Sequence, residues 1–332
     1  MFGREYQFWM GGRYATHLDE ITSDPRQLED GNFWVVVITF EGERKFARFK
    51  NLESGSFEAK EWRRLEGTWL SSLNQMDYMA YVSLIREAIS EGGVYQVNAC
   101  RILKKYLGHK DPSLAGLFAQ LLASNPAPYA QYLRIPGLEI ASASPELFLS
   151  RKGMKLKTSP IKGTIKRTEH EFGEKDKAEN LMIVDLMRND LGRVCKPGTV
   201  DVAELFRHEP HPGLIHLVSD VVGEIKDGTT WKEIFDATIA PGSVSGAPKS
   251  AAVEIISQHE GIRGPYCGAL GWIHGDQAEL AVGIRTFWKG DDQFLKFGTG
   301  AGITWGSDPA AEWEETQLKA RHLISIAGGE LP

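Results

Sequence analysis

Hydrophobic positions along this chain follow two periods, one typical of strands and one typical of helices. Short apolar stretches bounded by turn residues predict strands over residues 32–40, 44–49, 94–103, 129–134, 138–142, 147–152, 200–205, 214–225 and 294–304. A hairpin is expected over 269–288, turning at His274-Gly275-Asp276. Helical spacing predicts helices from 74 to a stop at Gly92-Gly93, and over 113–123, 174–193, 231–237, 250–259 and 310–327. Because strands and helices do not alternate as strict βαβ units, the pattern favours an α+β fold, a mixed α/β sandwich.

The first part of the chain carries only strand-like patterns, and the helical segments begin at Asn74. We therefore expect a short, β-rich N-terminal segment over residues 1–73 that packs on the same core as a larger catalytic domain over residues 74–332. No repeat, linker or low-complexity stretch separates the two in the sequence.

The composition narrows the classes of partner. A net charge of −6 over 332 residues argues against a nucleic-acid or anionic-membrane surface. The first residues lack the apolar core of a signal peptide, and the longest apolar run, 33–40, is too short to span a bilayer. The three cysteines are widely spaced and odd in number, which predicts neither a disulfide framework nor a zinc site. A cytoplasmic protein is expected.

A lysine in an unusual setting is the first candidate for chemistry. Lys162 lies in the stretch Pro160-Ile161-Lys162-Gly163, which predicts a tight turn bounded by proline and glycine. A lysine held in a partly dry pocket has a lowered pKa and can act as a nucleophile. A solvated lysine on a surface turn is the alternative, and these residues alone leave both interpretations open.

Two pairs of carboxylates are candidates for a metal site. Asp176 and Glu179 lie three residues apart near the start of one predicted helix, and Glu312 and Glu315 do so in the last. Each pair therefore lies on one helix face. If the two faces met, their oxygens would suit Mg²⁺. Acidic residues in a first turn also complement the helix dipole, which is the alternative explanation for each pair.

Glycine-rich segments and single polar residues give weaker indications. The segments 241–249, 264–269 and 298–302 could cradle an anion with their N–H groups, or could be ordinary turns. Arg285 lies in a predicted strand, where an inward arginine needs an anion such as a carboxylate. His216, on an apolar strand, has the pattern of a core histidine, and Glu146 that of an acid at a strand edge.

Taken in order, these segments resemble the chorismate-utilising enzymes, which include anthranilate synthase component I, aminodeoxychorismate synthase component I and isochorismate synthase. The matching runs are residues 95–98, 144–146, 160–164, 178–191, 216–219, 241–249, 284–286, 300–303 and 312–320. The resemblance covers roughly residue 75 to the C-terminus. It implies the fold of anthranilate synthase component I with a shortened N-terminal region.

Two positions distinguish the members of this family. Anthranilate synthases usually have alanine where this chain has Lys162, whereas aminodeoxychorismate synthases have lysine. Isochorismate and salicylate synthases place a water-activating lysine where this chain has Gln96. The resemblance therefore implies amination of chorismate at C4 to 4-amino-4-deoxychorismate, a step toward 4-aminobenzoate and folate. Anthranilate synthase component I and a non-catalytic chorismate-binding paralogue are the alternatives.

The resemblance also implies roles for individual residues. Lys162 would attack C2 of chorismate, Glu146 would protonate the departing 4-hydroxyl, His216 would face the ring and Lys319 would supply positive charge. The substrate carboxylates would be bound by Arg285, Tyr266, Ser243, Gly300, Ala301 and Gly302. Mg²⁺ would be held directly by Glu179 and Glu315, and through waters by Asp176 and Glu312.

The nitrogen source is expected to be another polypeptide. The chain lacks a Gly-x-Cys-x-Gly glutaminase elbow, since Cys267 lies in Tyr-Cys-Gly-Ala. Ammonia is therefore expected from a separate glutamine amidotransferase subunit or from solution. No fused lyase that would release 4-aminobenzoate is expected in this chain.

Overall fold

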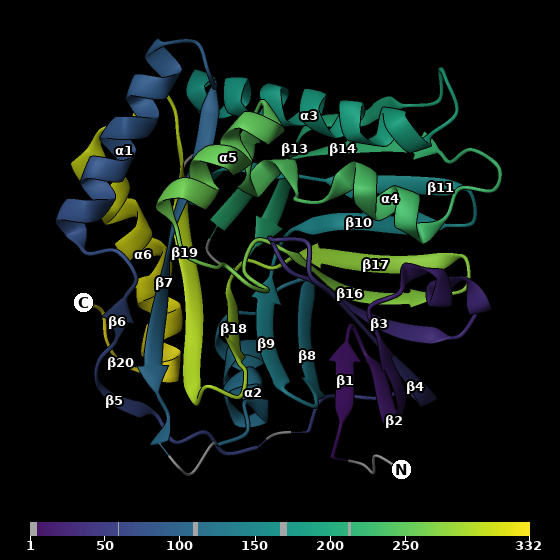
Figure 1. Cartoon of the computed structure of the whole chain (residues 1–332). Coiled ribbons are helices and arrows are strands. Elements are labelled where there is room, and N and C mark those ends of the chain that lie inside the picture. Colours follow the sequence, from purple (N-terminus) through teal and green to yellow (C-terminus); the bar gives the residue numbers. More distant parts are fainter. Residues whose placement is uncertain (1–4, 59, 109–111, 167–170, 212–213) are drawn as a thin grey trace.

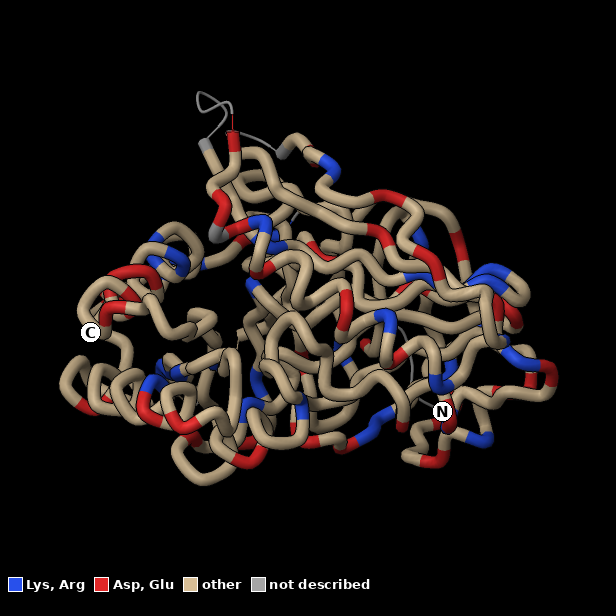
Figure 2. The backbone as a smooth tube through the Cα atoms, turned by 90° about the horizontal axis from the view of Figure 1, so that it is seen from above, with Lys and Arg blue, Asp and Glu red and all other residues tan. Residues whose placement is uncertain are grey.

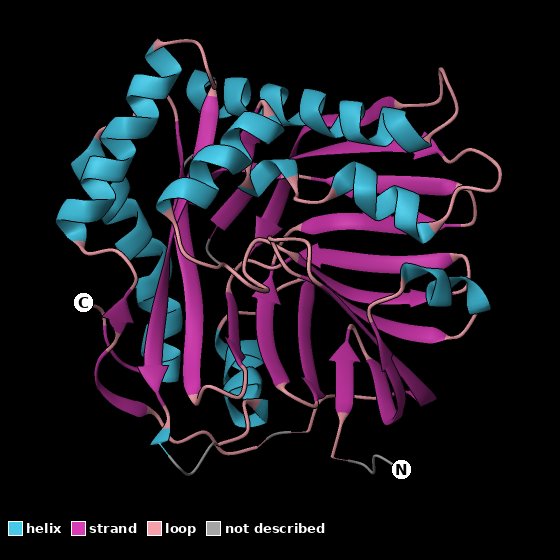
Figure 3. Ribbon diagram, in the orientation of Figure 1, coloured by secondary structure: helices cyan, strands magenta, loops and turns pink. Residues whose placement is uncertain are grey.

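The computed structural model describes residues 5–58, 60–108, 112–166, 171–211 and 214–332. Helices lie on the outside of a long, curled antiparallel sheet (Figures 1 and 3), so the α+β class is confirmed. The helices are α1 (Gln75–Ser90), α2 (Ala115–Ser124), α3 (Glu174–Val194), α4 (Trp231–Thr238), α5 (Lys249–His259) and α6 (Pro309–Ala327), with short 3-10 turns η1 (Pro25–Asp30) and η3 (Gly242–Val244).

Within the described residues, the strands belong to two sheets, one of eighteen strands and one of two. The N-terminal strands are β1 (Gln7–Met10), β2 (Arg13–Thr22), β3 (Phe33–Ile38), β4 (Arg44–Ser54), β5 (Leu65–Thr68) and β6 (Leu70–Ser71). The middle of the chain forms β7 (Gln96–Tyr106), β8 (Tyr129–Ile135), β9 (Leu138–Ser144), β10 (Leu147–Lys152), β11 (Lys155–Ser159) and β12 (Ile161–Lys166). The remaining strands are β13 (Asp201–His211), β14 (Leu214–Glu224), β15 (Gly246–Ala247), β16 (Ala269–His274), β17 (Gln277–Val282), β18 (Thr286–Lys289), β19 (Phe294–Ile303) and β20 (Gly328–Glu330).

The large sheet can be followed as one chain of antiparallel pairs. From β7 the pairing passes through β19, β18, β9, β8, β1, β2, β4, β3, β16, β17, β10 and β11 to β14. In Figure 1 the strands β7, β19, β18, β9 and β8 stand upright, whereas β17, β10, β11 and β14 lie across them. The sheet therefore turns through a corner, which brings its two halves together beneath the helices.

The helices cover this sheet with their apolar faces. Helix α3 packs on β14 and β12, α5 on β7, and α6 on β19 and α1. In α1 the buried residues are Tyr78, Tyr81, Val82 and Ile85, whose spacing makes one helical stripe. Asn74 caps this helix by accepting a hydrogen bond from the Asp77 N–H. All six predicted helices are confirmed to within two residues at each end.

The N-terminal strands belong to the same sheet as the rest of the chain. Strand β3 pairs with β16 along its whole length, and β1 pairs with β8. Phe8, Trp34 and Phe46 are buried in one hydrophobic cluster with residues from as far along the chain as Trp313. Within the described ranges, no helix is both long enough and apolar enough to cross a membrane.

One local prediction was wrong. The segment around Lys162 is strand β12 and not a tight turn, because it pairs with β14. The sequence signals of Pro160 and Gly163 favour a turn, but long-range pairing overrides them. Strands β1, β2, β5, β6, β11, β15 and β20 were also missed.

Candidate active site

A bulge in strand β12 sets the position of Lys162. Ile161 lies opposite Val218 and Thr164 lies opposite His216, so β12 has one residue more than β14 between these pairs. Such an insertion bends the strand and re-aims side chains. Gly163 adopts φ +86, and a Cβ there would lie 3.0 Å from the Cβ of Asp176, so glycine is required.

The amine of Lys162 is held at the bulge in a partly buried place. Its Nζ donates a hydrogen bond of 2.8 Å to the carbonyl oxygen of Ser243. Burial lowers the pKa of Lys162, while the negative charges of Glu146 and Glu179 act in the opposite sense. The lowered pKa increases the fraction of neutral, nucleophilic amine near neutral pH.

Glu146 is a buried acid next to this lysine. Ser144 fixes its backbone, since the Ser144 hydroxyl donates to the Val282 carbonyl (2.6 Å) and accepts from the Glu146 N–H (3.3 Å). Burial raises the pKa of Glu146, opposed by the Ser243 side chain and the charge of Lys162. Its Oε1 makes no hydrogen bond to any described residue. Glu146 is therefore a candidate proton donor to a ligand.

Strand β19 forms a floor of small residues beside the lysine. Gly300, Ala301 and Gly302 lie opposite residues 98–100 of β7. A Cβ on Gly302 would lie 2.3 Å from the Gln96 Nε2 and 3.9 Å from the Lys162 Nζ, so a larger residue there would displace the Gln96 amide. The side chains of Gln96 and Lys162 therefore lie close to the backbone of β19 at Gly302.

The carboxylates of α3 and α6 approach this lysine from two helices. Glu179 and Glu315 each raise the pKa of Lys162 against the effect of burial, and Lys319 acts in the opposite direction. Lys319 forms an ion pair of 2.6 Å with Glu315 and donates to the Gly300 carbonyl at 3.0 Å. Lys319 therefore links helix α6 to strand β19 by a hydrogen bond, and the charges of Lys319 and Glu315 act on Lys162.

The other two candidate metal ligands are held differently. Asp176 accepts a hydrogen bond from the Gly173 N–H (3.3 Å) at the start of α3, and Glu312 is buried in the first turn of α6. In the described part of the chain, His, Cys, Asp and Glu side chains nowhere gather in threes as a preformed metal site. By chemistry, the carboxylate oxygens of both helices fit Mg²⁺, which keeps several of its waters when bound.

Arg285 does not lie in a strand, contrary to the sequence-based expectation. It occupies the break between β17 and β18, with φ +51, and its carbonyl accepts from the Ala143 N–H at 3.0 Å. The chain here leaves its pairing with β16 and joins β9. Burial lowers the pKa of Arg285 and the charge of Glu146 opposes this, so its side chain lies near the acid.

Tyr266 and His216 lie against different strands of the site. The Tyr266 ring lies against Gly298, and the Cys100 thiol donates to its hydroxyl over 3.8 Å. His216 is buried in β14, with Nδ1 2.8 Å from the Thr164 hydroxyl. His216 and Lys162 therefore belong to paired strands, and Tyr266 contacts the floor strand.

Acidic and basic positions are interspersed over the whole molecule (Figure 2). Attraction of an anionic substrate must therefore come from local charges such as Lys162, Lys319 and Arg285. The site therefore combines the Lys162 amine, whose pKa is lowered, with the Glu146 carboxyl, whose pKa is raised, and Ser243 contacts both groups. Shifted pKa values cluster at functional sites, so this pair marks a candidate catalytic centre.

Comparisons with known proteins show the family to which the chain belongs. Residues 13–325 match the family model described as chorismate binding enzyme. The chain belongs to this family. The match begins well before residue 75, where the sequence motifs start, because the N-terminal strands are part of the family fold.

Curated relatives include both kinds of aminating enzyme. Anthranilate synthase component 1 of Saccharolobus solfataricus is 39% identical over 77% of this chain and 63% of its own length. That of Aquifex aeolicus is 38% identical over 77% of this chain and 54% of its own length. Aminodeoxychorismate synthase component 1 of Escherichia coli is 35% identical over 84% of this chain and 63% of its own length. This family member thus spans between about half and two thirds of the length of these relatives.

Solved structures share the fold. The menaquinone-specific isochorismate synthase of Escherichia coli superposes with a TM-score of 0.84 at 18% identity, over 97% of this chain and 88% of that one. Anthranilate synthase component I of Streptococcus pneumoniae gives 0.77 at 22% identity, over 89% and 80%. These likenesses confirm the expected fold, including its resemblance to anthranilate synthase component I.

Some residues at the site carried no assigned role from the sequence. Gln96 entered only as a difference between subfamilies, yet it is buried beside Lys162, and its Oε1 has no hydrogen-bond partner among the described residues. Its place in the 95–98 motif was the available signal. Thr164 could not be linked to His216, because the register of β12 on β14 cannot be read from either strand alone.

Proposed function

We propose that this chain is component I of a cytoplasmic aminodeoxychorismate synthase, which aminates chorismate at C4 with ammonia from a separate glutamine amidotransferase subunit. Lys162 is the single observation that carries the proposal. Its amine lies on the β12 bulge beside Glu146, at a position where anthranilate synthases usually have alanine. A lysine of lowered pKa is suited to covalent catalysis.

In the first step the neutral Lys162 amine would attack C2 of chorismate. The ring double bonds shift toward C4, the C4–oxygen bond breaks, and Glu146 gives its proton so that the hydroxyl leaves as water. The secondary ammonium formed at C2 then gives one proton back to the Glu146 carboxylate, which restores the acid. Burial of both groups favours this step, because it favours the neutral form of each.

In the second step ammonia would attack C4 of the adduct. The double bonds shift back, the bond from C2 to the Lys162 nitrogen breaks, and the departing amine takes up a proton that the new ammonium loses. The sum is chorismate plus ammonia giving 4-amino-4-deoxychorismate plus water. The enolpyruvyl group is retained throughout.

The remaining residues would bind and orient the substrate. The amides of Gly300, Ala301 and Gly302 and the hydroxyl of Ser243 would receive the ring carboxylate. Arg285 and Tyr266 would bind the enolpyruvyl carboxylate. His216, held by Thr164, would position the ring, and Lys319 would add positive charge beside Glu315.

Mg²⁺ would be held by Glu179 and Glu315, with Asp176 and Glu312 acting through waters, and when bound it would neutralise the ring carboxylate. Removal of Mg²⁺ with a chelator is therefore expected to abolish amination. Glu179→Gln and Glu315→Gln are each expected to raise the Mg²⁺ concentration for half activity by at least about tenfold.

A control for the metal variants lies on α3, the helix that carries Glu179. Glu174 is an exposed acid at the start of α3 that pairs with Lys177, so Glu174→Gln should leave the Mg²⁺ requirement unchanged. Calorimetry of Mg²⁺ binding with chorismate present gives a second readout that does not depend on turnover. Equal Mg²⁺ requirements in all three variants would contradict the assignment.

The product identifies the function. Purified protein given chorismate, Mg²⁺ and ammonium should form a product with the mass of aminodeoxychorismate, and 4-aminobenzoate should appear only after a lyase is added. Mass spectrometry and chromatography against both aminobenzoates distinguish the outcomes. Formation of 2-aminobenzoate with free pyruvate would refute the proposal.

Anthranilate synthase component I is the second candidate. The observation that favours it is the somewhat higher identity to anthranilate synthases, 38–39%, than to the aminodeoxychorismate synthase of Escherichia coli, 35%. The two reactions differ in the carbon that receives nitrogen and in whether pyruvate is eliminated. Metal-independent binding of chorismate without any product would instead point to a non-catalytic paralogue.

A further inference from the structure

Ser243 lies between the two groups that the proposed reaction uses. Its carbonyl accepts the hydrogen bond from the Lys162 Nζ at 2.8 Å. Its side chain hydrogen-bonds the carboxyl of Glu146, which lowers the pKa of Glu146 against the effect of burial. Ser243 belongs to the short turn η3, which is followed at Gly246 by β15, a two-residue strand paired with β7. The position of this turn therefore sets both contacts at once.

A buried arginine ties the turn to strand β7. The Arg263 Nη1 donates to the carbonyl of Val244, the residue after Ser243, at 3.0 Å. Its Nη2 donates to the carbonyl of Asn98 in β7 at 2.6 Å. The Asn98 N–H in turn donates to the Ser245 carbonyl at 2.9 Å. The Arg263 guanidinium thus bridges the η3 turn, through Val244, and strand β7, through Asn98.

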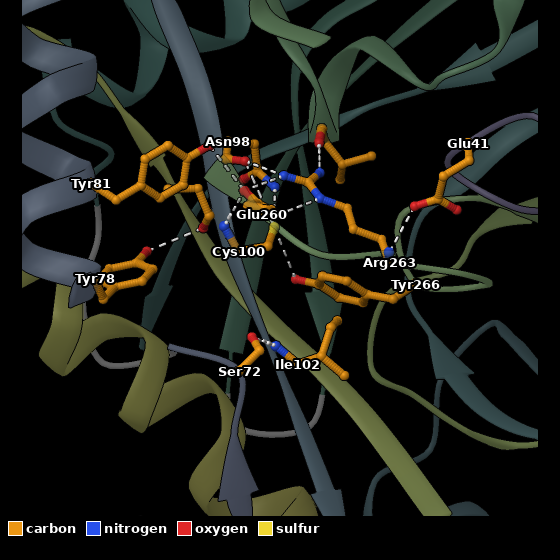
Figure 4. A network of polar contacts seen from close by, with 12 residues as sticks. Glu41, Ser72, Tyr78, Tyr81, Asn98, Cys100, Ile102, Glu260, Arg263 and Tyr266 are labelled. Carbon is orange, nitrogen blue, oxygen red and sulfur yellow. Dashed lines mark hydrogen bonds and ion pairs between the residues drawn. The ribbon is translucent and has the colours of Figure 1, made fainter. Parts of the chain in front are cut away.

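Glu260 fixes the orientation of this arginine, as Figure 4 shows. Its two oxygens accept from the Arg263 Nε and Nη2, each at 2.7 Å. Glu260 also accepts from the Cys100 N–H (2.9 Å) and the Tyr81 hydroxyl (3.1 Å). Arg263 is only 1% exposed, and its Cζ lies 4.2 Å above the Phe40 ring.

The chemistry of the guanidinium explains why an arginine is suited to this place. A buried ion pair is costly to desolvate, and apolar side chains of equal volume often stabilise a fold as well or better. The planar fork of arginine can instead donate to one carboxylate and two carbonyls in fixed directions, which a lysine cannot do. The pair is therefore better explained by the geometry that it imposes than by stability.

We propose that Arg263 and Glu260 are positioning residues, which hold the η3 turn so that Ser243 keeps Lys162 and Glu146 in reacting position. This inference rests on the proposed roles of Lys162 and Glu146. The geometry itself does not depend on which carbon of chorismate is aminated.

The test compares two conservative variants with a matched control. Arg263→Lys keeps the charge but cannot reach all three acceptors, and Glu260→Gln keeps the shape but loses the charge. The control is Arg101→Lys, because Arg101 is also 1% exposed and its Cζ lies 4.1 Å above the Trp313 ring. Arg101 donates to Thr316 and Ser71, which both lie outside the η3 turn.

The first readout needs no turnover. Each full-length protein is treated with acetic anhydride at fixed pH, and the modification rate of Lys162 relative to the exposed Lys50 is measured by peptide mass spectrometry. Loss of the Ser243 carbonyl contact should raise this ratio by about tenfold in Arg263→Lys, the equivalent of one hydrogen bond to a charged group. Arg101→Lys should leave the ratio unchanged even where the melting temperature falls equally.

The second readout is kinetic. In Arg263→Lys we expect kcat to fall by about tenfold or more while KM for chorismate changes by less than about twofold, because binding groups stay in place. Unchanged labelling of Lys162 in both Arg263→Lys and Glu260→Gln, with lowered melting temperatures, would overturn the inference. If the unmodified protein fails to aminate chorismate at C4, the proposed function fails, and the labelling still decides whether this pair positions Lys162.

Discussion

Replacing Lys162 by alanine is expected to lower kcat for aminodeoxychorismate formation by at least about a thousandfold, because the covalent route through C2 is lost. Chorismate binding should persist, since Arg285 and the β19 floor do not depend on this amine. Mass spectrometry of the product and a binding isotherm for chorismate measure the two effects separately.

Lys155→Ala is the control for this variant, because Lys155 is an exposed lysine in the adjacent strand β11. It should retain full activity. A second arm is rapid acid quenching of the unmodified protein, which should capture the mass of the adduct on the peptide that contains Lys162. Amination at the wild-type rate by Lys162→Ala would exclude a covalent role and remove the main argument for C4 amination.

Glu146→Gln is expected to lower kcat by about 10² to 10⁴, the usual contribution of a general acid. The acid must carry a proton, so kcat of the unmodified protein should fall as pH rises through the raised pKa of Glu146. Glutamine does not titrate, so this alkaline limb should disappear in the variant. A pH profile of kcat for both proteins measures it.

The same substitution should make the folded protein more stable at neutral pH. Between the ordinary glutamate value of 4.5 and the raised pKa of Glu146, the native state binds more protons than the unfolded state. The free energy of unfolding therefore decreases as pH rises through this window, and the loss is complete above the native pKa. Glu146→Gln escapes this loss, so its melting temperature should exceed that of the wild type increasingly with pH.

Glu279 supplies the matched control for Glu146. Burial also raises the pKa of Glu279, which lies in β17 near Arg13 and Lys152. Glu279→Gln should therefore gain stability with pH in the same sense, yet keep full activity. A fall in kcat in both variants would indicate a general effect of buried carboxylates and not a general acid at Glu146.

Much of the fold could be predicted from local pattern. Helices α1 and α6 were predicted from helical spacing of apolar residues, and the structure adds their caps at Asn74 and Asp308. Such signals act within a few residues along the chain. The pairing partners of the strands were not readable, because β7 meets β19 and β3 meets β16 across long stretches of sequence.

The candidate site was predicted only as a set of separate motifs. Taken alone, each of these residues had an alternative interpretation without a function: Glu146 as a solvated acid and Lys162 as a surface lysine. The structure removes that alternative for Glu146 by burying it. The sequence pattern predicted a strand at Arg285. In the structure the chain changes its strand partner there, and Arg285 itself adopts a left-handed conformation.

The sequence by itself determined the helices, the residue types for covalent and acid chemistry, and the family resemblance, because these depend on order and spacing along the chain. Only the tertiary structure decided that Lys162 lies on a bulge, that Ser243 joins it to Glu146, and that Arg263 holds the joining turn. The physical reason is that burial and long-range strand register shift a pKa and aim a side chain. Neither exists until distant segments have packed together.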